Sequence, residues 1–425
     1  MNDSSLKQEF DVIVVGSGTC GATIARELSR QKKKVLVLEQ GTNRELKESF
    51  LSAASIANAV TVSDKLATMR AITTGGSTAL YFAVAEPPAL DSFQALGIDL
   101  SKVYENVKKE LPLSTLPDHL LGEQSKRLRD SAIELGYDWK KKMMLIDQSK
   151  CDSGYSYEAR WKAKSYLQEA IANGATLITR AKVDKIIIEK NRAIGVEYKH
   201  KNNLISQNTC KAYATKIILA AGSLASPLIL RNSGIKDAGK HGFYCCPNFA
   251  ALGFIPGLKG TNNFVGNMSA KLDEDIVIGD ANLSSTFFKM VMLAEFKFSK
   301  FFSYSNSIAV GGSIKDGISG EIMDNGRYYK KLSAGVYGKL KRGEEAGIKI
   351  LQNAGAKNIM RFGYASANVG GLIRINEHVD ESLQTEYTNL HVCDGSVLPE
   401  NSSLSPTLTL ICLAKYLSEK LSSSL

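Results

Sequence analysis

The sequence lacks a long apolar run: none of its uninterrupted apolar stretches reaches the roughly 18 residues that a membrane-spanning helix needs. The first residues, Met-Asn-Asp-Ser-Ser, have neither the basic region nor the apolar core of a signal peptide. These two absences predict a protein without a transmembrane segment, located in the cytoplasm.

Paired cysteines are also missing. There are seven cysteines, an odd number, and no CxxC motif, which argues against a disulfide framework and against a zinc site. We therefore predict no metal. Cys20, Cys393 and Cys412 lie in apolar or glycine-rich segments, where a cysteine acts as a small apolar side chain.

The formal net charge is +10, but no long basic stretch carries it. The lysine clusters at 32–34, 140–142 and 330–331 are short and have no interleaved aromatic residues. We therefore expect solvated faces and no nucleic-acid partner. Contact with an anionic membrane surface stays open as a weaker interpretation.

What the chain does have is the composition and length of a globular enzyme. Its 425 residues are 44% hydrophobic and 23% charged, enough for two domains or a discontinuous pair.

The first 40 residues contain the clearest motif. The apolar run from Asp11 to Val15 leads into glycines at 16, 18 and 21, then a helical pattern, then Val35-Leu-Val-Leu-Glu39. This order is typical of a fold that binds a dinucleotide by its pyrophosphate. Gly16 permits the turn, Gly18 admits the phosphates, and Gly21 lets the helix pack closely on the strand. Glu39 would bind the ribose hydroxyls and disfavours a 2′-phosphate, so NADP is not expected.

Further along the chain, the pattern changes twice. Polar, helix-like sequence follows Glu39 up to the Gly75-Gly76 pair. A second α/β block begins near Cys151, and glycine-rich, aromatic sequence with short alternating runs then predicts an antiparallel sheet. The last 60 residues return to strand and helix. We predict an α/β fold: a Rossmann-like dinucleotide-binding domain from 1–90, 150–240 and 365–425, a helical connecting segment at 91–149, and an antiparallel-sheet substrate or cover domain at 241–364.

Four segments together resemble the glucose–methanol–choline (GMC) family of flavoprotein oxidoreductases. They are the first glycine motif with Glu39, Thr74-Gly-Gly-Ser77, the stretch 216–235, and the stretch 389–417 with its Asp394-Gly395 and Ser405-Pro406. The last stretch is the most specific.

The resemblance implies FAD as the cofactor, with NAD alone a weaker alternative. It assigns the cofactor contacts to Gly16, Ser17, Gly18, Thr19, Gly21, Glu39, Gln40, Gly75, Gly76, Val183, Ala221, Gly222, Asp394, Gly395, Pro406 and Thr407. The helix that begins after Pro406 would direct the positive end of its dipole toward the flavin.

The chain departs from the family at the catalytic base. Where members carry a histidine before a glycine pair, this chain has Asn368, or Ala367 if the spacing differs by one, and Ser405 stands before the proline of the final helix. Neither Asn368 nor Ser405 is a base near neutral pH. His378, His391 or Tyr364 could replace the histidine, or the reaction could be a hydride transfer that needs no base, such as desaturation.

We therefore predict an FAD-dependent oxidoreductase that moves hydride between a small CH–OH donor and flavin, with Asn368 and Ser405 as the catalytic-site residues that position the substrate. Its partners would be that substrate and an unknown electron acceptor. The alternatives are a lyase or isomerase that keeps FAD structurally, and a flavin-binding protein without catalysis.

Overall fold

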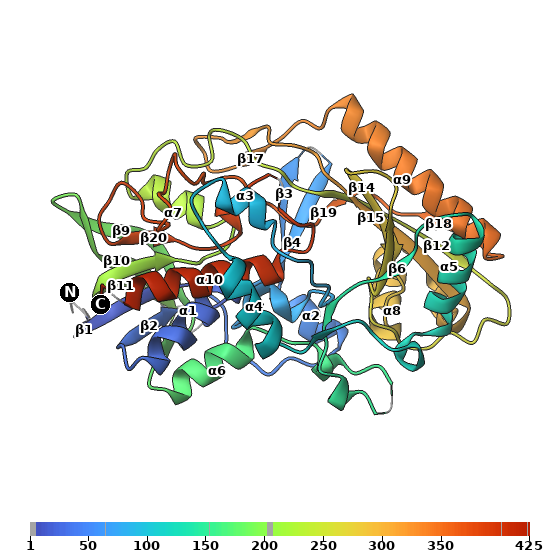
Figure 1. Cartoon of the computed structure of the whole chain (residues 1–425), viewed down its shortest axis with the longest axis horizontal. Helices are drawn as coiled ribbons and strands as arrows, with labels where there is room; N and C mark the ends of the chain where they lie inside the picture. The colour runs from blue at the N-terminus through green and yellow to red at the C-terminus, as the bar shows by residue number, and fades with distance from the viewer. Residues whose placement is uncertain (1–5, 64, 153, 202–206, 401, 423) are drawn as a thin grey trace.

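The computed structural model describes residues 6–63, 65–152, 154–201, 207–400, 402–422 and 424–425. Two β-sheets, one in each lobe of the molecule, organise the chain (Figure 1). No helix of this described part combines the length and the apolar character needed to cross a bilayer.

The first sheet is largely parallel. Its strands stand in the order β8 (Thr176–Ile178), β2 (Val35–Leu38), β1 (Leu6–Val15), β11 (Gln207–Leu219), β10 (Arg192–Lys201) and β9 (Ala181–Glu189), and β20 (Leu390–Val392) also pairs with β11. β1, β2, β8, β11 and β20 run parallel, whereas β9, β10 and β11 form an antiparallel meander. All four residues of β2 are buried, as expected of a parallel strand covered on both faces.

Helices pack on this sheet from distant parts of the chain. α1 (Thr19–Arg30) contacts both α6 (Lys164–Ala172) and α10 (Thr407–Ser422), the last helix of the chain (Figure 1). These contacts, together with β20, bring the chain end back to the first domain as the sequence predicted. The Rossmann-like domain with an antiparallel-sheet cover domain is therefore confirmed.

The second sheet is mainly antiparallel. Its order is β3 (Ala57–Ser63), β4 (Leu66–Ala71), β19 (Ala365–Ser366), β12 (Pro247–Phe254), β15 (Ser307–Ile314), β14 (Ile276–Asp280), β13 (Met268–Lys271) and β6 (Lys140–Lys141), with β18 (Lys357–Arg361) also on β12. α9 (Ala334–Asn353) covers one face, and α8 (Ser285–Ala294) packs on residues of β12 and β15 that point to the other. A Cβ at Gly347 of α9 would lie 2.8 Å from Val310, so glycine allows this close approach.

The remaining helices connect or border the sheets. They are α2 (Phe50–Ile56), α3 (Leu90–Gln94), α4 (Ser101–Glu110), α5 (Glu123–Glu134) and α7 (Ser226–Asn232). Short strand pairs join β5 (Leu113–Ser114) to β7 (Met144–Leu145) and β16 (Glu321–Ile322) to β17 (Tyr328–Tyr329).

Two expectations were wrong. The stretch after Glu39, read as helix-like, contains the short α2 and then the β3–β4 hairpin. Residues of β4 alternate between buried and exposed, which fits a half-buried strand. Lys330, expected on a solvated face, is buried and forms an ion pair with Asp316 at 2.6 Å. β3, β4 and β6, which come early in the chain, pair within the second sheet.

Candidate functional site

A cavity of about 780 Å³ lies where the two sheets meet. The carboxyl ends of β1 and β2 and the residues after β11 form one wall, and the β3–β4 hairpin forms another. Residues 367–369, 394–395, 398, 406 and 410, from the end of the chain, complete it. In open α/β sheets, ligands bind in the crevice outside the carboxyl ends of the strands, so the fold itself predicts a binding site here.

The turn from β1 to α1 is shaped for an anion. Gly16 has φ 96°, a conformation that glycine adopts without strain. A Cβ at Gly21 would lie 2.0 Å from the carbonyl oxygen of Gly16, so only glycine lets the helix pack this closely. A Cβ at Gly18, the N-cap of α1, would meet no protein atom within 4 Å. Gly18 lines the cavity, so this free space lies at the helix N-terminus, where unpaired N–H groups bind phosphates.

Glu39 is buried at the end of β2 and also lines the cavity. One carboxylate oxygen accepts hydrogen bonds from the backbone N–H (3.0 Å) and the hydroxyl (2.6 Å) of Ser17, and the other accepts from the N–H of Gly41 (2.7 Å). Burial raises the pKa of Glu39, and these hydrogen bonds oppose the increase. The carboxylate is thus held rigidly beside the turn from β1 to α1. A carboxylate fixed in this way is suited to accept a hydrogen bond from a ribose hydroxyl.

Asp394 also lines the cavity and has a structural role there. Its carboxylate accepts bonds from the N–H of Gly222 (2.9 Å) and the hydroxyl of Ser226 (2.5 Å), and also from the N–H (2.9 Å) and hydroxyl (2.6 Å) of Ser396. It therefore fixes Gly222 beside Gly395. A Cβ at Gly222 would meet no protein atom within 4 Å, so the cavity is open here too.

The structure places most of the predicted cofactor residues on the cavity wall. They are Gly16, Ser17, Gly18, Thr19, Glu39, Gln40, Gly76, Val183, Ala221, Gly222, Asp394, Gly395 and Pro406. Gly21, Gly75 and Thr407 are not among the lining residues. Gly75 has φ 82°, and a Cβ there would lie 2.8 Å from the backbone of Lys164, so it shapes the turn that presents Gly76.

Sequence reasoning missed the positively charged residues of the cavity, chiefly Arg70 on β4. Its Nε donates to Asn58 at 2.8 Å, and no acidic side chain of the described residues pairs with it. Burial lowers the pKa of Arg70. Tyr328 and Arg327 also line the cavity, and the Tyr328 hydroxyl donates to the carbonyl of Leu224. The sequence does show an arginine five residues before Gly75. Arg70 reaches the cavity only because β4 belongs to a hairpin that the sequence analysis did not predict.

The two predicted catalytic-site residues are neighbours. Asn368 lines the cavity, and its Nδ2 donates to the carbonyl of Leu404 at 2.5 Å. Ser405 follows Leu404, but it is not a lining residue, and its backbone N–H donates to Glu86 at 3.2 Å. Asn368 is therefore the better placed of the two to touch a ligand.

None of the three residues considered as replacement bases lines the cavity. His391 is buried beside the carbonyl of Ser382, and burial lowers its pKa to about 4. Tyr364 is near Tyr337, with ring centroids 6.5 Å apart. His378 lies close to Asp237 and His241 in a group that could hold a metal by spacing. However, the N–H of Arg374 donates to its Nδ1, so neutral His378 carries its proton on Nε2 and cannot ligate through it.

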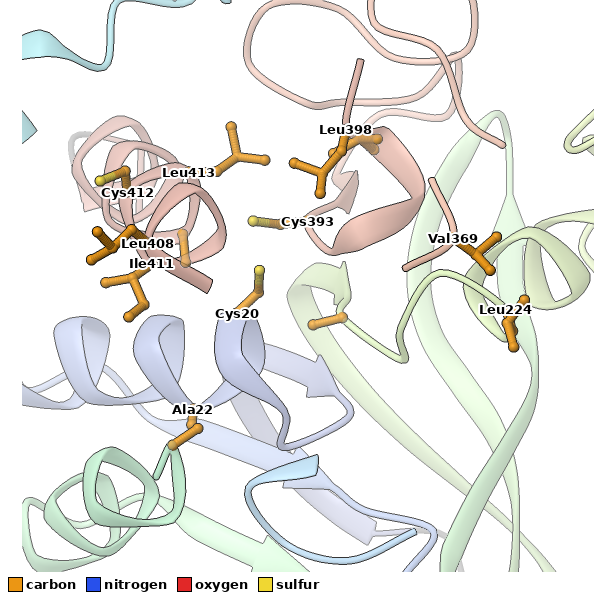
Figure 2. Close-up of a cluster of buried hydrophobic side chains, with 14 of the residues drawn as sticks. Cys20, Ala22, Leu224, Val369, Cys393, Leu398, Leu408, Ile411, Cys412 and Leu413 are labelled. Atoms are coloured by element: carbon orange, nitrogen blue, oxygen red, sulfur yellow. The ribbon is translucent and has the colours of Figure 1, made fainter. Parts of the chain in front are cut away.

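The cavity rests on a packed apolar core. Figure 2 shows Cys20 of α1 and Cys393 beside one another, next to Leu408, Ile411 and Cys412 of α10. Cys20, Cys393 and Cys412 are buried, and all seven cysteines are free. Apolar contacts therefore hold the start of α1 against the final helix, α10.

These residues fit FAD. The cavity has the size of a cofactor pocket. Two glycines, Gly18 and Gly222, leave open the space that a side chain would fill. A helix N-terminus and Arg70 face the same cavity as Glu39, which matches a ligand with a diphosphate next to a ribose.

Comparison with known proteins agrees with this geometry. A family model described as GMC oxidoreductase matches residues 10–243. An uncharacterised protein of Methanocaldococcus jannaschii is 25% identical over 96% of this chain and 98% of its own length. The long-chain-alcohol oxidase FAO3 of Arabidopsis thaliana is 23% identical over 99% of this chain and 69% of its own.

Solved structures share the fold. Pyridoxine 4-oxidase from Mesorbium loti superposes with a TM-score of 0.72 at 15% identity, over 98% of this chain and 99% of that one. Formate oxidase from Aspergillus oryzae gives a TM-score of 0.70 at 13% identity, over 100% and 99% of the two chains. The family model matches more than half of the residues of this chain, and the fold encloses a cavity suited to FAD. This chain therefore belongs to the GMC family of FAD-dependent oxidoreductases.

Proposed function

We propose that this protein oxidises a small CH–OH donor, with Asn368 positioning the substrate hydroxyl. FAD, when bound, supplies the acceptor for the substrate's hydride. The main support is that Asn368, which we infer from the sequence to stand at the family's histidine position, lines the FAD-sized cavity. The relatives named as alcohol oxidases support a CH–OH donor.

Asn368 can orient a hydroxyl but cannot remove its proton. Its Nδ2 is engaged with Leu404, and no hydrogen bond to its Oδ1 is found in the described part of the chain, so Oδ1 is the group that would accept from a substrate hydroxyl. An amide has no useful pKa, so the proton would pass to water. Lack of a general base costs about 10²- to 10⁴-fold in rate, and we expect slow oxidation of simple alcohols.

A second candidate, FAD binding without turnover, is favoured by one observation. No histidine is among the described residues that line the cavity. A lyase or isomerase would ordinarily also use a base, so the same observation counts against that alternative.

Anaerobic reduction of the bound flavin separates these functions. The purified holoprotein is mixed with a panel of primary, secondary and aromatic alcohols, and flavin bleaching is followed, with dithionite as the positive control. We expect at least one alcohol to bleach the flavin. If dithionite reduces it and no alcohol does, the second candidate holds instead. A folded protein that takes up no FAD would contradict both.

A further inference from the structure

The surface of the cover domain exposes an unusual group of aromatic side chains. The segment from Leu293 to Phe302, here called the aromatic loop, begins with the last two residues of α8 and continues beyond it. Phe296, Phe298 and Phe302 are 79%, 60% and 87% exposed. Single exposed apolar residues are ordinary, but three exposed phenylalanines within seven positions form a patch, and such patches mark interaction sites.

The aromatic loop is held in place by the core. Phe288 and Met292 of α8 are 1% and 0% exposed and pack with Leu252 and Ala309 of the second sheet. Phe288 also meets Tyr304 edge to face, with ring centroids 5.5 Å apart. Both ends of the loop are thus fixed to the sheet, so its phenylalanines are presented to solvent on a folded support.

Backbone geometry at Phe296 adds a second, independent observation. The N–H of Lys297 bonds to the carbonyl of Met292 (2.8 Å) and that of Phe296 to Leu293 (3.1 Å), which is the Schellman arrangement at a helix end. The residue at the centre of this motif is usually glycine, but here it is Phe296 with φ 55°. A strained, exposed phenylalanine contributes little to the stability of the chain itself, so its use points to a contact outside the chain.

The charge around the loop selects the kind of partner. Lys289, Lys297 and Lys300 have no acidic partner among the described residues, and Glu295 is the one acidic residue between 285 and 306. Phenylalanines that insert among apolar groups, next to lysines that attract acidic headgroups, are the composition of an interfacial membrane anchor.

We propose that the aromatic loop docks this protein on the surface of a bilayer that contains anionic lipid. Phe296, Phe298 and Phe302 enter the boundary between headgroups and acyl chains, while Lys297 and Lys300 contact the headgroups. This surface is distinct from the lysine clusters seen in the sequence, and the proposal does not depend on the catalytic activity.

Sedimentation with vesicles tests the proposal. The holoprotein is mixed with vesicles of phosphatidylcholine alone, or of phosphatidylcholine with phosphatidylglycerol, at low and moderate salt. We expect binding to the mixed vesicles that weakens with salt. The triple variant F296S/F298S/F302S should bind at least tenfold more weakly at both salt concentrations. The charge variant K297E/K300E should lose the preference for phosphatidylglycerol.

The matched control is Ile133→Ser on α5, an apolar side chain that is 54% exposed elsewhere on the molecule, and it should bind like the wild type. Retained FAD shows that each variant folds. Absence of wild-type binding at low salt, or equal binding by the triple variant, would overturn the proposal. The proposal would also be overturned if the wild type binds no vesicles but forms a concentration-dependent dimer that the triple variant does not form. The aromatic loop would then contact a second copy of the chain.

Discussion

Arg70 is the charged side chain that we expect to contribute most to binding the FAD diphosphate. The glycine turn alone suggests that backbone N–H groups balance the diphosphate. Arg70, however, faces the same cavity and has no acidic partner in the part of the chain that the structure describes. A charge-assisted hydrogen bond contributes about 1.5–3 kcal/mol. Arg70→Ala should therefore weaken FAD binding roughly 10- to 100-fold, measured by titrating the apoprotein and following flavin fluorescence.

The control for this measurement is Arg129→Ala on α5, which pairs with Asp118 and Asp130 at the surface and should bind FAD normally. An unchanged dissociation constant in Arg70→Ala would show that backbone groups suffice.

At the same scale, a substitution at Asn368 tests the proposal that the site has no general base. A histidine at this position would provide a group that can take the hydroxyl proton, and general bases contribute about 10²- to 10⁴-fold. Asn368→His should therefore raise the rate of flavin reduction by simple alcohols by about 10²-fold or more. The rate is measured by anaerobic stopped-flow, with Asn368→Gln as a control that keeps the amide. A rate no faster than that of the wild type would indicate a pocket rebuilt for another substrate.

Among the elements, α1, α4, α6 and α10 meet at one carboxylate, Glu110. It pairs with Arg26 and Lys415, each at 2.5 Å, and accepts from the Tyr166 hydroxyl. Burial alone would raise the pKa of Glu110, but hydrogen bonds from Lys415 and Tyr166 and the charge of Arg26 outweigh it and lower the pKa to about 2.

This pKa makes the helix packing sensitive to acid. Because the folded-state pKa lies below the ordinary 4.5, the stabilisation is complete above pH 4.5 and is lost as pH falls toward 2. Glu110→Gln should cost about 2 kcal/mol near neutral pH, after allowance for its partial exposure, and flatten the acid limb of the stability curve. Denaturant midpoints against pH measure this, and Glu105→Gln, whose pair with Lys108 is exposed, should behave like the wild type.

Elements differ in how far local sequence specifies them. β2 and α10 were predicted because a buried parallel strand and an amphipathic helix each carry their pattern in consecutive residues. The β3–β4 hairpin was not, because its place depends on pairing between Thr68 and Ser366, nearly 300 residues apart. Arg70 reaches the cavity through that hairpin, so its role was hidden as well. Local motifs thus predicted the glycine turn and Glu39, whereas the part of the cavity wall formed by the β3–β4 hairpin depends on the tertiary fold.

At the scale of the whole molecule, the cavity joins the two sheets, so FAD should stabilise both. Binding to the folded state alone adds about 2.7 kcal/mol when free FAD is 100 times its dissociation constant. We expect the melting temperature of the apoprotein to rise by several degrees on addition of FAD, with fluorescence and circular dichroism giving one coincident transition.

Gly18→Val is the matched variant for this measurement. A Cβ at Gly18 meets no protein atom within 4 Å, and its φ of −69° suits other residues, so the apo variant should melt close to the wild-type apoprotein. Its side chain would occupy the space at the N-terminus of α1, so FAD should no longer raise the melting temperature. A normal FAD-induced shift in Gly18→Val would mean that the diphosphate lies elsewhere in the cavity. A lowered apo melting temperature would instead assign Gly18 to folding.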